Sequence, residues 1–158
     1  RIKLVNIRGK SIKDIKELLK RNKPKLVVID QIDKVSNVLR KDKEHDRLKS
    51  LYGDVRALAQ EFCPIIAISQ ADASTRWLDK QTEEIQYQHY IDQSQLDGSK
   101  IGKPGEADFI ITIGQDKNYP NIRYIHVPKN KGDSKQDYER KIKAEVKFKG
   151  DICRYENF

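Results

Sequence analysis

The apolar positions along the chain change between helix-like and strand-like spacing. In residues 11–22 and 45–62 they recur every three or four positions, which predicts two amphipathic helices. Ser11 is a suitable N-cap for the first helix. Short apolar runs predict three strands, at residues 2–7, 24–30 and 64–69. The run at 24–30 is typical of a strand buried on both faces, and 64–69 of another buried strand. This order of strand, helix, strand, helix and strand favours right-handed crossovers and a parallel α/β sheet.

The second half of the chain has a different pattern. Residues 71–106 are polar and glycine-containing, so we expect a long loop region with a short helix around 82–92. Four later segments are expected to form strands, at residues 108–114, 121–128, 140–148 and 151–158. Lys149-Gly150-Asp151 is typical of a tight hairpin turn, which favours antiparallel pairing in this half. We interpret residues 1–158 as a single domain.

Charge and cysteine content narrow the classes of protein. The net charge is +8, which suits a polyanionic partner, although residues 72–116 carry four basic and nine acidic groups. Cys63 and Cys153 are far apart and lack metal-binding spacing, so we expect two buried thiols in a reducing compartment. No run approaches the roughly 20 apolar residues of a membrane-spanning helix. Because the chain begins with Arg1 and has no Met, we expect sequence upstream.

The first candidate for chemistry is Gly9-Lys10-Ser11, which has the last three letters of the phosphate-binding loop GxxxxGK[ST]. The first glycine of that loop would fall on Leu4, inside a predicted strand. We therefore expect Gly9 to turn the chain, Lys10 to be solvated and Ser11 to cap the helix.

Two further candidates follow predicted buried strands. "KLVVIDQIDKV" has the Walker B pattern, in which a carboxylate, here Asp30, holds Mg²⁺ beside nucleotide phosphates. An aspartate that only caps the following turn has the same pattern. "PIIAISQAD" places Gln70 at the same sheet edge if the strands are neighbours. There its amide could sense a γ-phosphate or form only a polar strand end.

A last candidate is a pair of lysines at the end of a later strand, Lys129 and Lys131. They could reach a phosphate together or form a solvated basic turn.

Taken in order, these stretches resemble a known family. "LVVIDQIDKV", "CPIIAISQAD", "GEADFIITIGQD", "IRYIHVPKNKGD" and "VKFKGDICRYENF" are similar to the C-terminal motor domain of hexameric replicative DNA helicases. That family contains the DnaB-like bacterial helicases and the phage primase-helicases, and it has a RecA-like core. The resemblance covers most of residues 24–158, and "DQIDKV" is more similar to the phage members.

The resemblance implies roles for particular residues. Asp30 matches the Walker B carboxylate that orders Mg²⁺, and Gln70 matches the polar sensor at a strand end. Lys129 and Lys131 match the basic pair that reaches the ATP site of the neighbouring subunit, although the family usually has Arg in place of Lys131. The loop 93–105 matches a segment that touches DNA. The implied DNA contacts are Ser99, Lys100, Gly102 and Lys103, with Arg76 and Trp77 in a second loop.

The resemblance also implies the wider setting. Its partners would be ATP or another NTP, Mg²⁺, single-stranded DNA, five further copies in a homo-hexamer, and a primase domain or primase partner. The location would be the cytoplasm of a bacterial cell, with a cellular or phage gene as the source. The family's phosphate-binding loop and catalytic Glu would lie upstream of Arg1, so the chain alone should hydrolyse ATP poorly or not at all. A recombinase or clock-type RecA relative, a non-catalytic DNA-binding or assembly module, and a structural α/β domain remain alternatives.

Overall fold

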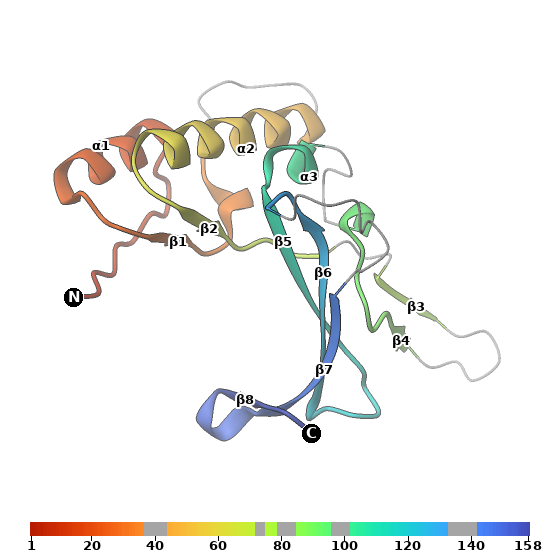
Figure 1. Cartoon of the computed structure of the whole chain (residues 1–158). Helices are drawn as coiled ribbons and strands as arrows, with labels where there is room; N and C mark the ends of the chain where they lie inside the picture. The colour runs from red at the N-terminus through yellow and green to blue at the C-terminus, as the bar shows by residue number, and fades with distance from the viewer. Residues whose placement is uncertain (37–43, 72–74, 79–84, 96–101, 133–141) are drawn as a thin grey trace. The chain divides into compact units, whose positions relative to one another are not determined.

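The structure, a computed structural model, describes residues 1–36, 44–71, 75–78, 85–95, 102–132 and 142–158. It divides into two compact units (Figure 1). The first unit contains Arg1–Gln70 and Ile101–Glu106, and the second contains Ala71–Lys100 and Ala107–Phe158. No helix among the described residues is long and apolar enough to cross a membrane.

The first unit begins with a loop and a well-capped helix, α1 (Ile12–Asn22). Gly9 has a φ of 71°, a left-handed conformation that glycine adopts without strain, and it turns the chain before the helix. The Ser11 hydroxyl accepts a hydrogen bond from the backbone N–H of Asp14, and the Asp14 carboxylate accepts one from the backbone N–H of Ser11. This reciprocal capping box confirms the predicted role of Ser11 as the N-cap, and the left-handed conformation of Gly9 confirms its predicted role in the turn.

The first unit also contains a pair of parallel strands covered on one face by helices. Strand β1 (Val27–Ile29) pairs with β2 (Ile65–Ala67), and α2 (Glu44–Glu61) connects them after a short 3₁₀ turn, η1 (Ile32–Lys34). One apolar core lies between the strands and the helices. Its buried members are Ile15, Leu19, Ile29, Ile32, Val35, Leu48, Leu51, Val55 and Leu58. The short helix α3 (Gly102–Glu106) packs against α2.

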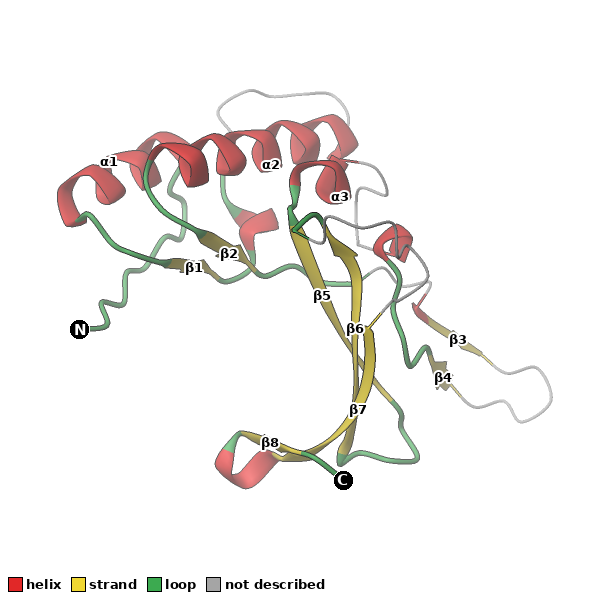
Figure 2. Cartoon of the chain, viewed as in Figure 1, coloured by secondary structure: helices red, strands yellow, loops and turns green. Residues whose placement is uncertain are grey.

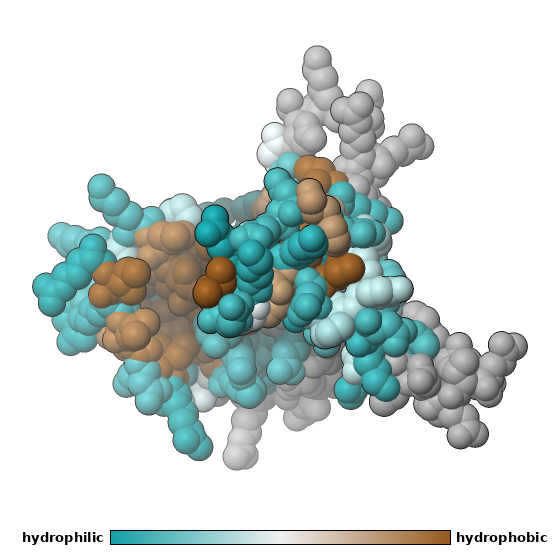
Figure 3. All heavy atoms as spheres, turned by 90° about the horizontal axis from the view of Figure 1, so that it is seen from below, coloured by the Kyte–Doolittle hydropathy of each residue, from teal (hydrophilic) through white to brown (hydrophobic). Residues whose placement is uncertain are grey.

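The opposite face of the same two strands is apolar and exposed. Val28 and Ile66 are 57% and 51% exposed, whereas the alternate residues Val27, Ile29, Ile65 and Ala67 face the core. Figure 3 shows apolar residues gathering on this face. Parallel strands are normally buried on both faces, so the described residues provide only one of two expected layers.

The second unit is mainly antiparallel (Figure 2). A four-stranded sheet has the order β5 (Phe109–Gln115), β6 (Ile122–Asn130), β7 (Ile142–Lys149) and β8 (Arg154–Glu156). A separate hairpin joins β3 (Arg76–Leu78) to β4 (Ile85–Tyr87). Two short 3₁₀ turns complete the unit, η3 (Gln93–Gln95) and η4 (Gly150–Ile152). The predicted division into a parallel and an antiparallel half is therefore confirmed.

Four local expectations were wrong. Residues 2–7 form no strand, and Ile2 and Leu4 are 90% and 93% exposed, because no described strand lies beside them. Strand β4 occupies part of the helix expected around 82–92, whose residues 82–84 lie outside the described residues. Cys63 is buried as expected, but Cys153 is exposed, since it follows η4 at the sheet edge. The turn at Lys149-Gly150-Asp151 is a longer 3₁₀ turn and not a tight hairpin turn.

Candidate functional site

The carboxyl ends of β1 and β2 bring two of the predicted residues to one edge. The strands are parallel neighbours, and backbone hydrogen bonds continue their ladder beyond the strand ends. The N–H of Ile68 donates to the carbonyl of Ile29 at 2.9 Å, and the N–H of Ile32 donates to the carbonyl of Ile68 at 3.1 Å. Asp30 directly follows β1, and Gln70 comes three residues after β2, so both lie at this edge.

Asp30 presents a carboxylate to solvent at this edge. Its side chain is exposed and makes no hydrogen bond or ion pair with any other residue that the structure describes. Gln31 follows with a φ of 53°, and this left-handed residue turns the chain from β1 into η1. Asp30 therefore lies immediately before this turn, and its exposed side chain is accessible to a ligand.

The arrangement around Asp30 fits a magnesium ion that arrives with a nucleotide. Within the described ranges, no three His, Cys, Asp or Glu side chains cluster closely enough to hold a metal ion by themselves. Mg²⁺ in nucleotide sites commonly binds one or two carboxylates, directly or through water, and takes its other ligands from phosphates and water. A single exposed carboxylate at a strand end therefore suits that ion, whereas it would not hold a structural metal.

A hydrogen-bonded cluster centred on Asp33 joins η1 to α2 and to the segment that follows β2. The Asp33 carboxylate accepts from the Tyr52 hydroxyl at 3.0 Å and from the Ser69 hydroxyl at 2.6 Å. The Arg47 guanidinium donates to the backbone carbonyl of Asp33 at 2.8 Å. The sequence analysis assigned no role to Asp33 or to its partners Tyr52 and Ser69, which lie 19 and 36 residues away from it along the chain. The only local signal is that Ser69 directly precedes the predicted sensor Gln70.

The predicted lysine pair lies in the second unit, at the end of β6. Lys129 is half-buried and pairs with Ile110 of β5. Lys131 is exposed, and its Nζ lies 3.3 Å from the Asp108 carboxylate. Its backbone N–H also donates to the carbonyl of Asp108 at 2.9 Å. This exposed ion pair contributes little stability, roughly 0–1 kcal/mol, so Lys131 can exchange Asp108 for another anion.

The predicted DNA-contacting residues are distributed over several elements. Arg76 is exposed in β3, opposite Tyr87, so Arg76 and Trp77 lie in a hairpin strand and not in the expected loop. Gly102 and Lys103 begin α3. Ser99 and Lys100 lie outside the described residues. The described residues of the region 71–106 are thus partly regular, and they include two strands, a 3₁₀ turn and a short helix.

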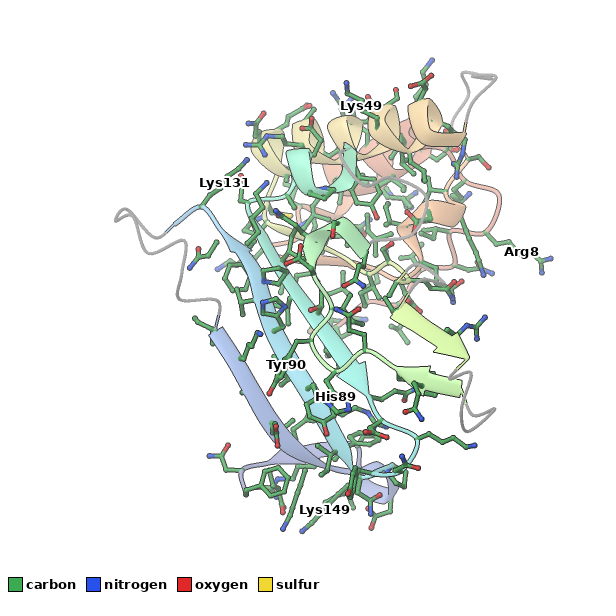
Figure 4. The ribbon with its side chains drawn as sticks, turned by 90° about the vertical axis from the view of Figure 1, so that its right-hand side faces the viewer. Arg8, Lys49, His89, Tyr90, Lys131 and Lys149 are labelled. Carbon is green, nitrogen blue, oxygen red and sulfur yellow. The ribbon has the colours of Figure 1, made fainter. Side chains whose placement is uncertain are left out.

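An aromatic cluster crosses the sheet of the second unit. The His89 and Tyr124 rings stack with centroids 3.9 Å apart, and Tyr90 meets Tyr124 edge-on. The Nε2 atom of His89 lies 2.7 Å from the Asp116 carboxylate. A backbone hydrogen bond from Asn118, followed by the contact with His89, lowers the pKa of Asp116. Figure 4 shows His89 and Tyr90 lying across the sheet, with Lys131 and Lys149 toward its opposite ends.

Comparisons with known proteins place the fold. No protein-family profile matches the chain, and no curated protein matches its sequence. The ATPase domain of one DnaB-like helicase is similar in structure, with a TM-score of 0.73 and 18% identity, over 95% of this chain and 52% of that one. A second DnaB-like replicative helicase, solved to show its interactions with primase, has a TM-score of 0.70 and 19% identity, over 95% of this chain and 35% of that one.

These similarities establish the fold. The chain has the RecA-like fold of helicase ATPase domains, which confirms the fold class expected from the sequence. The chain spans about half the length of the first of these structures, the isolated ATPase domain, and about a third of the second, the helicase studied with primase.

Proposed function

We propose that this chain forms part of the ATP-driven motor of a replicative DNA helicase of the DnaB-like type. The observation that carries the proposal is the parallel pairing of β1 and β2, which brings Asp30 and Gln70 to one sheet edge. In open α/β sheets, ligands bind outside the carboxyl ends of the strands. The order of the sequence motifs and the helicase-like fold support the same assignment.

ATP, or another NTP, is the proposed cofactor, together with Mg²⁺. Asp30 would hold the ion, because its carboxylate is exposed and makes no interaction with the other described residues. Gln70 would contact the γ-phosphate from the neighbouring strand end. Phosphoryl transfer depends mainly on positioning and on neutralising charge at the phosphates, and these two residues supply one side of such a site.

The remaining side of the site would come from further sequence of the same motor. The similar helicase ATPase domain is about twice as long as the region of it that matches this chain. The exposed apolar face of β1 and β2, which includes Val28 and Ile66, is suited to packing against such additional elements. We assign the phosphate-binding loop and the catalytic Glu to that additional sequence, so that the 158 residues alone would be inactive.

The proposed polymeric partner is single-stranded DNA, and the proposed assembly is a homo-hexamer. Lys129 and Lys131 would reach the nucleotide of the neighbouring subunit, with Lys131 acting as a simple cation because it lacks the planar fork of Arg. The DNA contacts are assigned to Arg76, Ser99, Lys100, Gly102 and Lys103. A primase partner is proposed because the similar DnaB-like helicase interacts with primase.

The experiment replaces Asp30 in the natural full-length protein. We expect Asp30→Ala to abolish unwinding of a forked DNA substrate while leaving folding and binding of a single-stranded oligonucleotide intact. Asp54→Ala is the matched control, because Asp54 is an exposed carboxylate of α2 with no interaction among the described residues. A fully active Asp30→Ala variant would refute the assignment. If the wild type binds the oligonucleotide but neither unwinds DNA nor hydrolyses ATP, a non-catalytic binding module is supported instead.

A further inference from the structure

Asp33 connects three elements of the first unit through one carboxylate. It belongs to η1, three residues after Asp30, and its carboxylate accepts hydrogen bonds from Tyr52 of α2 and from Ser69 beyond β2. The Ser69 contact is short, at 2.6 Å, as expected for a hydroxyl that donates to a carboxylate. The side chains of Asp33, Tyr52 and Ser69 are all half-buried.

The backbone around Asp33 is held as well. The Arg47 guanidinium donates to the carbonyls of Asp33 and Val35, at 2.8 and 3.4 Å. The N–H of Ile32 donates to the carbonyl of Ile68, which ties η1 to the chain just before Ser69. The segments that follow β1 and β2 are therefore joined by backbone hydrogen bonds, and the Asp33 carboxylate adds a side-chain hydrogen bond between them.

The protonation states suit this arrangement. Burial raises the pKa of the Tyr52 hydroxyl well above its ordinary value, and the negative charge of Asp33 raises it further. Tyr52 consequently keeps its proton and donates at any physiological pH. A contact with Ser69 acts in the opposite direction and lowers the pKa of Tyr52, but burial is the larger effect.

We propose that Asp33 is a positioning residue that holds Gln70 in place relative to Asp30. This inference rests on the proposed function, in which those two residues contact the phosphates and Mg²⁺. Ser69 is bonded to Gln70 through the peptide link, so fixing the Ser69 side chain restrains the backbone from which the Gln70 side chain projects. Without Asp33, the segment from Ser69 to Gln70 loses this short side-chain tether to η1, and the sensor amide samples more positions.

The test uses four single variants of the natural full-length protein and the double variant Asp33→Ala/Ser69→Ala. Asp33→Ala and Ser69→Ala each remove the tether from one end. Asp33→Asn keeps the shape and can still accept from Tyr52 while its amide donates to the Ser69 oxygen, so it should restore function. Asp54→Ala is the control for loss of a carboxylate, since Asp54 lies on the exposed side of α2. The readouts are kcat and KM for DNA-stimulated ATP hydrolysis, hydrogen exchange at residues 69–71, and the melting temperature.

We expect Asp33→Ala to lower kcat by about tenfold or more, with a much smaller change in KM, because misplacement of a catalytic group slows the chemical step. Ser69→Ala should have a similar effect, and the double variant should be no worse than Asp33→Ala, because Asp33→Ala already removes the Ser69 contact together with the one from Tyr52. Exchange at residues 69–71 should become faster in both, and Asp33→Asn should resemble the wild type.

Three results separate the possible failures. If kcat of Asp33→Ala and Ser69→Ala stays within about twofold of the wild type, or if exchange at residues 69–71 is unchanged, the positioning role is wrong. If the wild type hydrolyses no ATP, the proposed function fails, and the exchange measurement alone decides whether Asp33 restrains the Ser69–Gln70 segment. A loss of both kcat and melting temperature in Asp33→Asn as large as in Asp33→Ala would indicate a purely structural role and overturn the proposal.

Discussion

Gly114 and Gly53 offer the same substitution, glycine to alanine, with opposite expected results. Gly114 lies in β5, and a methyl group there would overlap the backbone carbonyl of His89. Gly53 lies in α2, where a methyl group would meet no atom within 4 Å. Gly114→Ala therefore reports on the close approach of β5 to the backbone of His89, and Gly53→Ala reports on the intrinsic preference of a helix for alanine.

The structure gives the expected magnitudes. All of the nearest atoms around a methyl group at Gly114 are backbone atoms of Gln88 and His89, which cannot rotate away as a side chain can. Overpacking commonly costs about 1–3 kcal/mol, and we expect the upper end here. At roughly 2–4 °C per kcal/mol for a chain of this length, the melting temperature should fall by about 6–12 °C. Gly53→Ala should instead add about 1 kcal/mol, or roughly 2–4 °C.

The assay is thermal and urea unfolding followed by circular dichroism, with hydrogen exchange of the β5 and β6 amides as a local readout. Gly114→Ala should also speed exchange in these strands, whereas Gly53→Ala should leave them unchanged. A Gly114→Ala protein that melts within about 1 °C of the wild type would refute the close approach of β5 to His89.

Three further results are expected. Ser11→Ala removes the cap of α1 and should cost about 1 kcal/mol in urea unfolding, whereas an unchanged midpoint would argue against the capping box. The lowered pKa of Asp116 means that its contribution to stability is present above pH 3.8 and is lost as the pH falls through the lowered value. Asp116→Asn should therefore reduce the loss of stability in acid, and identical acid titrations of both proteins would contradict a stabilising role for the hydrogen bonds of Asp116 with Asn118 and His89. Arg56 donates to the backbone carbonyl of Glu106 at 2.6 Å, so Arg56→Ala should loosen α3 by about 1.5–3 kcal/mol, seen as faster amide exchange there.

Local signals in the sequence were sufficient for the helices α1 and α2 and for the parallel strands β1 and β2. Helix α1 has an apolar face of the correct period and a capping residue, Ser11, at its start, and both features act within a few residues. The apolar run that contains β1 predicted a strand buried on both faces, whereas only its core side is buried and Val28 on the other face is 57% exposed. The prediction that Asp30 and Gln70 share one sheet edge followed from parallel pairing, and the strand register confirms that placement.

The parts that could not be predicted depend on contacts between distant residues. A strand needs a neighbour, so the apolar alternation at 2–7 was insufficient, and both Ile2 and Leu4 are exposed. Segment 85–87 is a strand because it pairs with 76–78, which outweighs its local helical pattern. The cluster around Asp33 joins side chains that are far apart in sequence, and no spacing rule connects Tyr52 with Ser69.

The most direct test of the account is the rate of ATP hydrolysis by the natural full-length protein, measured with and without a single-stranded oligonucleotide. We predict hydrolysis that requires Mg²⁺ and becomes faster when the oligonucleotide is added, because ATP turnover is coupled to movement along DNA. A folded protein that binds the oligonucleotide but hydrolyses no ATP under either condition would contradict the claim that this chain belongs to an ATP-driven motor.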